Sequence, residues 1–106
     1  MISAWLAAFA LTQLVEAPIY RFGAKASWPV ALLASTLTHP IVWFVFPLLT
    51  RLSYWEMVTC AESFAIVAEA CWLRANRVTL ALAWSLLANA ASVVIGLGLR
   101  AAFGAP

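Results

Sequence analysis

The sequence predicts an all-α integral membrane protein, a single up-down bundle of four transmembrane helices. Of its 106 residues 66% are hydrophobic and only 9% are charged, whereas a soluble domain carries about 25% charged residues. Its apolar residues gather in four long stretches, and a helix needs about 20 predominantly apolar residues to cross a bilayer. The segments between the stretches are short, so we expect one transmembrane domain over residues 1–106, with lipid around it.

The four predicted spans have recognisable limits. They cover approximately residues 2–18, 29–49, 55–73 and 78–99. Pro18 and the polar run 21–27 end the first span, and Pro29 suits the first turn of the second. The connection 74–77 is so short that spans three and four should be antiparallel neighbours.

Besides Glu56 in its first turn at the interface, two acidic residues lie inside the third span. Glu62 falls near its middle and Glu69 seven residues later, on the same helical face and about 10 Å away. A carboxylate at that depth costs several kcal/mol unless it is paired, protonated or hydrated, so intramembrane acids mark functional sites. Because no Lys or Arg of the chain can reach the level of Glu62, this residue is the central candidate.

The second span has an unusually polar centre. Thr38, His39 and Pro40 follow one another there, and Pro47 comes two turns later. Proline removes a backbone donor and disfavours helical geometry in the residue before it, so both prolines are predicted to kink the helix. The kink at Pro40 would leave His39 beside a freed carbonyl, as a possible ligand.

Counting along each span predicts which polar residues meet. His39, Glu62 and Asn89 fall near the middle of their spans, and Glu16 and Glu69 lie toward the side of the first and third connections. We therefore predict a column of proton-binding or ion-binding side chains. Its members are Glu62, His39, Glu69, Glu16 and Asn89, with Gln13, Thr12, Thr38, Ser85 and Ser92 as supporting polar groups.

Each of these residues also has a purely structural interpretation. Glu16 and Glu69 could pair with cationic side chains that reach in from the connections. Asn89 could join two helices by hydrogen bonds, as asparagine commonly does in membranes. His39 could likewise bond to a neighbouring span.

Metal chemistry receives little support from the spacing of residues. A divalent cation could take Glu62, His39 and Glu69 as ligands, but the patterns H-E-x-x-H, E-x-x-H and C-x-x-C do not occur. We therefore expect no cofactor, and a divalent cation stays open as an alternative. The net charge of +2 is spread over short connections, so nucleic acid is not an expected partner.

The distribution of Lys and Arg predicts the orientation. Connections one and three carry Arg21, Lys25, Arg74 and Arg77, while Arg51 and Arg100 lie on the opposite side. The excess of positive charge places connections one and three in the cytoplasm. The expected location is the cytoplasmic (inner) membrane of a bacterium.

Two resemblances can be named from these residues. In length, in its four spans and in Glu16 of the first span, the chain resembles the small multidrug resistance exporters. That resemblance implies a dimer in which the glutamate binds protons and cationic substrates competitively, although here Glu16 lies near the end of its span. The set of Glu16, Thr38 to Pro40, the Glu62/Glu69 pair and Asn89 to Gly96 is similar to small four-span bacterial membrane proteins of unknown function. It implies no activity.

Three functions follow from this reading. The first is a small transporter or channel that handles a proton or a cation through the Glu/His/Asn cluster. The second is a structural or accessory subunit of a larger membrane complex, and the third is an intramembrane enzyme acting on a lipid or peptide, for which no catalytic residue is predicted. Because four spans cannot enclose a wide pore, we expect a homo-oligomer, most simply a dimer.

Overall fold

Four helices make up the fold, as predicted. The computed structural model describes residues 2–48 and 51–104. The helical elements in chain order are α1 (Ile2–Pro18), η1 (Ile19–Gly23), α2 (Trp28–Phe44), η2 (Phe46–Leu48), α3 (Tyr54–Ala75) and α4 (Ala81–Phe103). η1 is a π-helical turn that continues α1, and η2 is a short 3-10 helix.

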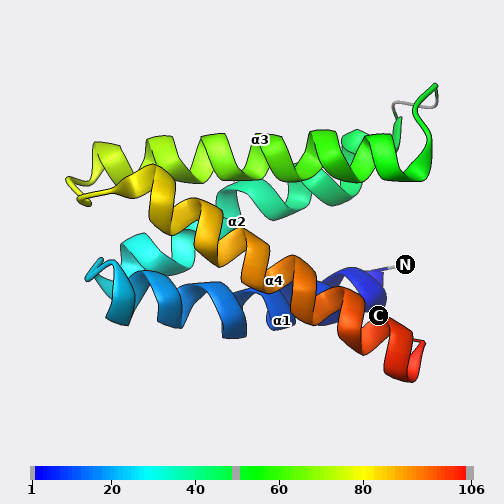
Figure 1. Cartoon of the computed structure of the whole chain (residues 1–106), viewed down its shortest axis with the longest axis horizontal. Helices are drawn as coiled ribbons and strands as arrows, with labels where there is room; N and C mark the ends of the chain where they lie inside the picture. Colours follow the sequence, from blue (N-terminus) through cyan, green and yellow to red (C-terminus); the bar gives the residue numbers. More distant parts are fainter. Residues whose placement is uncertain (1, 49–50, 105–106) are drawn as a thin grey trace.

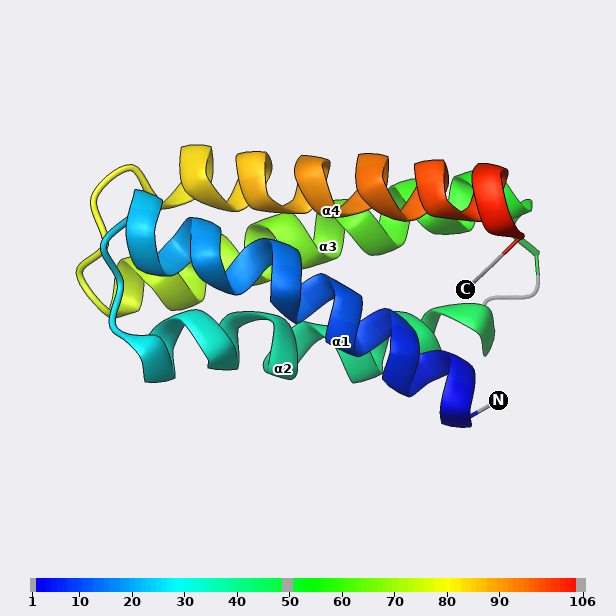
Figure 2. The same ribbon diagram turned by 90° about the horizontal axis from the view of Figure 1, so that it is seen from below.

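The helices form a ring in which successive helices run in opposite directions (Figure 1). α1 packs against α2 and α4, and α3 packs against the same two helices from the other side. Both termini lie at one end of the bundle (Figures 1 and 2). We call this end the terminal end, and we call the opposite end, which residues 24–27 and 76–80 form, the loop end.

Helix boundaries differ from the prediction at two places. α2 ends at Phe44 rather than near residue 49, and Pro47 lies in η2, where its missing N–H does not interrupt an α-helix. The helix continues through Pro40. α4 begins at Ala81, three residues later than predicted, because Leu80 adopts a left-handed conformation with φ 56°.

The start of α3 is fixed by a capping box. The Ser53 hydroxyl accepts the backbone N–H of Glu56 at 3.2 Å, and the Glu56 carboxylate accepts the N–H of Ser53 at 3.0 Å. Each side chain thus satisfies a backbone donor that a helix start leaves free. Glu56 therefore acts at the surface of the bundle.

Large apolar side chains lie on the outside of the bundle and small or polar ones inside. Leu14, Val94 and Leu82 are 75%, 69% and 61% exposed, respectively. The interior contains Ala31, Ala34, Ser35, Ser85 and Ala88, which allow the helices to approach closely. Among the helices of the described residues, α4 is the one whose length and apolar composition suffice to cross a membrane.

Candidate functional site

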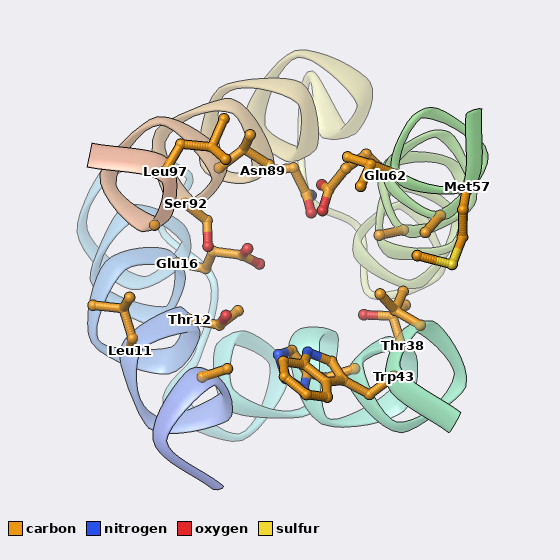
Figure 3. A pocket seen from close by; sticks show the side chains of 18 of the residues that line it. Leu11, Thr12, Glu16, Thr38, Trp43, Met57, Glu62, Asn89, Ser92 and Leu97 are labelled. Carbon is orange, nitrogen blue, oxygen red and sulfur yellow. The ribbon is translucent and has the colours of Figure 1, made fainter. Parts of the chain in front are cut away.

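A cavity of about 420 Å³ lies between the four helices. Figure 3 shows side chains from α1, α2, α3 and α4 directed into it. Most of the predicted polar residues line this cavity: Thr12, Glu16, Thr38, His39, Glu62, Glu69, Asn89 and Ser92. Three carboxyl groups therefore line one shared cavity.

Hydrogen bonds from three other elements converge on Glu69 of α3. The Tyr20 hydroxyl of η1 donates to Oε1 at 2.6 Å, and the Thr38 hydroxyl of α2 donates to Oε2 at 2.7 Å. The Asn89 amide of α4 donates to Oε1 at 3.2 Å. Glu69 is 2% exposed, so its buried carboxyl group joins α3 to η1, α2 and α4.

The meeting of Asn89 with Glu69 differs from the predicted arrangement, which placed Asn89 level with His39 and Glu62. The late start of α4 explains the difference. Asn89 lies eight residues, or about 12 Å, after Ala81, and Glu69 lies six residues, or about 9 Å, before Ala75. Both are therefore at a similar depth from the loop end.

Ser85 positions Asn89 from one turn earlier in α4. Its hydroxyl donates to the carbonyl of Ile66 in α3 at 2.7 Å, and its own carbonyl accepts the Asn89 amide at 2.9 Å. Ser85 is not part of the cavity lining. It supports the site by joining α4 to α3 and by orienting Asn89.

Glu16 of α1 is the second deeply buried acid, at 2% exposed. The Ser35 hydroxyl of α2 donates to its Oε1 at 2.8 Å. Ser92 of α4 and Glu16 point toward one another across the cavity (Figure 3). Glu16 and Glu69 face the same space from different helices, so their charges interact across it.

Glu62, the central candidate of the sequence, lines the cavity on α3 and is half-buried. The hydrogen bonds described above are accepted by Glu69, seven residues after Glu62 on α3, and by Glu16 on α1. Glu62 is thus the acid most open to the cavity, and Glu69 is the acid most firmly held.

His39 lies among aromatic rings at the edge of the cavity. Its ring centroid is 5.3 Å from Phe9, 6.3 Å from Trp5 and 6.1 Å from Trp43. The residue is 8% exposed, and its Nδ1 has no hydrogen-bond partner among the described residues. A buried polar atom without a partner is costly, so this nitrogen is a place where a water or ligand would gain a bond.

The wall of the cavity toward the terminal end is apolar and aromatic. Val42, Trp43, Met57 and Leu97 contribute to it. Arg100 is the one Lys or Arg in the lining, and it donates to the hydroxyl of exposed Tyr54 at 2.8 Å. It lies eleven residues, or about 16 Å, beyond Asn89 on α4, too far to neutralise the buried acids.

Three other predicted residues lie outside the cavity. Gln13 donates to the Leu32 carbonyl at 2.8 Å and to the Thr36 hydroxyl at 3.0 Å, so it joins α1 to α2. Pro40 lies within α2 and is not part of the lining. Pro47 lies in η2, and its side chain falls outside the described part of the structure.

Tyr20 and Ser35 bind the two buried acids but were not predicted as site residues. The sequence places Tyr20 just past a span, where tyrosine usually sits at the membrane surface. The π-helical turn η1 instead directs it inward, where it is 0% exposed. For Ser35 a signal existed, because it shares a helical face with Thr38 and His39 at spacings of three and four residues.

No metal centre emerges from this arrangement. Within residues 2–48 and 51–104, no three His, Cys, Asp or Glu side chains gather closely enough to hold an ion. His39, Glu62 and Glu69 share the cavity but do not form a ligand set.

Comparison of the chain with known protein families, with characterised proteins and with solved structures finds no match. The chemical groups of the site are therefore the basis for a proposed function. The cavity contains two buried acids, a third acid that is more exposed, hydroxyl and amide donors, and an apolar wall toward the terminal end. Such a site can accept a proton or a small cation.

Proposed function

We propose that this protein is a small membrane transporter or channel that handles a proton or a cation through the carboxyl groups of its cavity. The observation that carries the proposal is that Glu16, Glu62 and Glu69 face one cavity whose deep part contains no Lys or Arg among the described residues. Through the cavity, a proton or a cation that neutralises these acids can bind and leave.

Charge balance is the physical argument. Glu16 and Glu69 are each 2% exposed and face the same space. Two uncompensated carboxylates in such a place would cost many kcal/mol, so positive charge must enter with them. Because the protein supplies none nearby, a proton or a bound cation is the neutralising partner, and the two compete.

The surface of the bundle supports a place in the membrane. Large apolar side chains cover it on several helices, including Leu14, Leu37, Val67 and Leu86, each of which is 50% or more exposed. The longest extent of the bundle is 36 Å, slightly more than the hydrocarbon core of about 30 Å. The four-span topology, with the loop end in the cytoplasm, belongs to this proposal.

Access to the acids is one-sided. The cavity reaches Tyr54 and Arg100 near the terminal end, whereas Tyr20 and Leu73, both 0% exposed, pack together with Ala26 and Ala81 at the loop end. Passage of an ion toward the loop end requires this cluster to open. The bond between Tyr20 and Glu69 is therefore the contact that opening must break.

The structural-subunit hypothesis has one observation in its favour. The three donors on Glu69 come from three different elements, which is also how a purely structural interhelical connection is built. Under that hypothesis Glu69 stabilises the bundle, and the cavity transports nothing.

Flux measurements separate the two hypotheses. The chain is reconstituted alone in liposomes, and proton uptake is followed with an entrapped pH-sensitive dye under an imposed membrane potential. The measurement is repeated under an inward gradient of Na⁺ or tetraethylammonium. We expect flux in the wild type, and its loss in Glu16→Gln and in Glu69→Gln.

Glu56→Gln is the matched control, because glutamine also completes the capping box at the surface of α3. It should transport like the wild type. Absence of flux in the wild type, together with a lower Tm for Glu69→Gln, would reject transport in favour of the structural subunit.

A further inference from the structure

A second recess, of about 630 Å³, opens at the loop end of the bundle. Its lining comes from the segments 23–27, 76–80 and the start of α4, which lie at the same end of the bundle in both views (Figures 1 and 2). It contains two cations, Lys25 and Arg77, and the polar side chains of Ser27, Asn76 and Thr79. Within the part of the chain that the structure describes, no carboxylate lines it.

The positive charge of this recess has no acidic counterpart nearby. The chain contains four acidic residues. Three of them, Glu16, Glu62 and Glu69, line the central cavity, and Glu56 lies in the first turn of α3, at the other end of that helix. The recess therefore keeps its positive potential.

The backbone holds both cations in a conformation that side chains other than glycine rarely adopt. Lys25 has φ 63° and Arg77 has φ 64°. Each follows the end of a helical segment, where glycine is the usual residue because a Cβ atom is disfavoured. Residues held in sparsely populated conformations are more common at functional sites. Lys25, Arg77 and Leu80 all have a positive φ and all line this one recess.

From this geometry we propose that the loop-end recess binds a phosphate group, with Lys25 and Arg77 as its two cationic ligands. Ser27 and Thr79 are the hydroxyl groups in reach of the recess. Trp84 and Val30 give it an apolar side, which suits a phosphate attached to lipid. Basic recesses of this kind at the cytoplasmic ends of membrane helices bind anionic headgroups. The proposal does not depend on transport through the central cavity.

Two sources can supply the phosphate, and the test distinguishes them. The Tm of the purified chain in a neutral detergent is measured with added phosphatidylglycerol, with added phosphatidylcholine, and with inorganic phosphate alone. We expect phosphatidylglycerol to raise Tm and phosphatidylcholine to leave it unchanged. A rise with inorganic phosphate alone would identify the ligand as a soluble phosphate at the same site.

Double variants test whether the rise in Tm comes from binding at the loop-end recess. Lys25→Gln/Arg77→Gln should lose the rise in Tm. Arg51→Gln/Arg74→Gln is the control, since it removes the same charge from residues outside the recess, and it should keep the rise.

Lys25→Arg/Arg77→Lys preserves both charges and should also keep the rise, which guards against a variant that simply folds poorly. No rise in Tm with either ligand, or an equal rise in Lys25→Gln/Arg77→Gln, would overturn the proposal.

Discussion

At the scale of single residues, Tyr20 shows most clearly how the site is built. It is 0% exposed and donates to Glu69 at 2.6 Å. Its removal would leave the carboxyl group with the donors Thr38 and Asn89 only. A hydrogen bond of this kind contributes about 1–3 kcal/mol to stability when its acceptor is buried.

Tyr20→Phe should therefore lower the free energy of unfolding by about 1–3 kcal/mol, measured by denaturant titration in detergent. Tyr54→Phe is the matched control, because Tyr54 also forms a single side-chain hydrogen bond, in which its hydroxyl accepts from Arg100, but is 47% exposed. Its effect should stay within about 0.5 kcal/mol. Equal effects of the two variants would contradict the role given to Tyr20.

At the residue scale, the sequence indicated which polar residues lie inside the bundle, but it placed Asn89 at the wrong depth. The acids Glu16 and Glu69, with Thr38 and Asn89, were candidates from polarity at membrane depth alone, and the structure places all four around one cavity. Which acid receives the hydrogen bonds could not be predicted. Glu62 and Glu69 share a face of α3, and only the packing of the other helices decides between them.

At the scale of elements, η1 is the feature that the sequence did not reveal. The Ala24 N–H donates to the Ile19 carbonyl at 3.1 Å, and the Ala26 N–H donates to the Tyr20 carbonyl at 2.9 Å. Wide turns of this kind often occur at functional sites. Pro18 suggested that the helix ends, whereas α1 includes Pro18 and the chain continues directly as the π turn of η1.

The contact between η1 and α4 depends on Gly23. A Cβ atom there would lie 2.6 Å from Cζ3 and 2.8 Å from Cη2 of Trp84. Gly23→Ala should therefore push the indole aside and lower stability by about 1–3 kcal/mol, measured as above. Replacing the ring as well, in Gly23→Ala/Trp84→Leu, should recover part of the loss.

Gly98→Ala in α4 is the control, because nothing lies within 4 Å of a Cβ atom at that position. It should be neutral, or stabilising by up to about 1 kcal/mol, since alanine is the better helix former. If Gly23→Ala proved as stable as Gly98→Ala, η1 would not pack on α4 as described.

At the scale of the whole molecule, a single chain encloses the site. The cavity of about 420 Å³ is lined by all four helices of one chain, so the acids meet without a second copy. The expectation of a dimer came from the small number of spans and stays a prediction. The all-helical fold and the order of four helices were predictable because apolar stretches alternate with short polar connections.

The contacts between helices are the part of the structure that could not be predicted from the sequence. The inward position of Tyr20 and the shared depth of Glu69 and Asn89 depend on helix ends, which composition locates only to within a few residues. A shift of three residues at the start of α4 moves a side chain by about 4.5 Å along the axis. Which side chains hydrogen-bond to one another in the cavity could therefore be determined only from the structure.

The central claim is that the carboxyl groups of the cavity are neutralised by a proton or a cation that can be exchanged. Infrared difference spectroscopy of the chain in lipid tests it directly, because protonated carboxyl groups absorb apart from carboxylates. Between mildly acidic buffer, in which an exposed glutamate is already ionised, and alkaline buffer, the wild type and Glu56→Gln should show the same loss of protonated-carboxyl absorption, and Glu16→Gln/Glu69→Gln should show much less. Addition of a cation that binds should reduce the same absorption at constant pH. An identical difference spectrum in the wild type and Glu16→Gln/Glu69→Gln would contradict the claim.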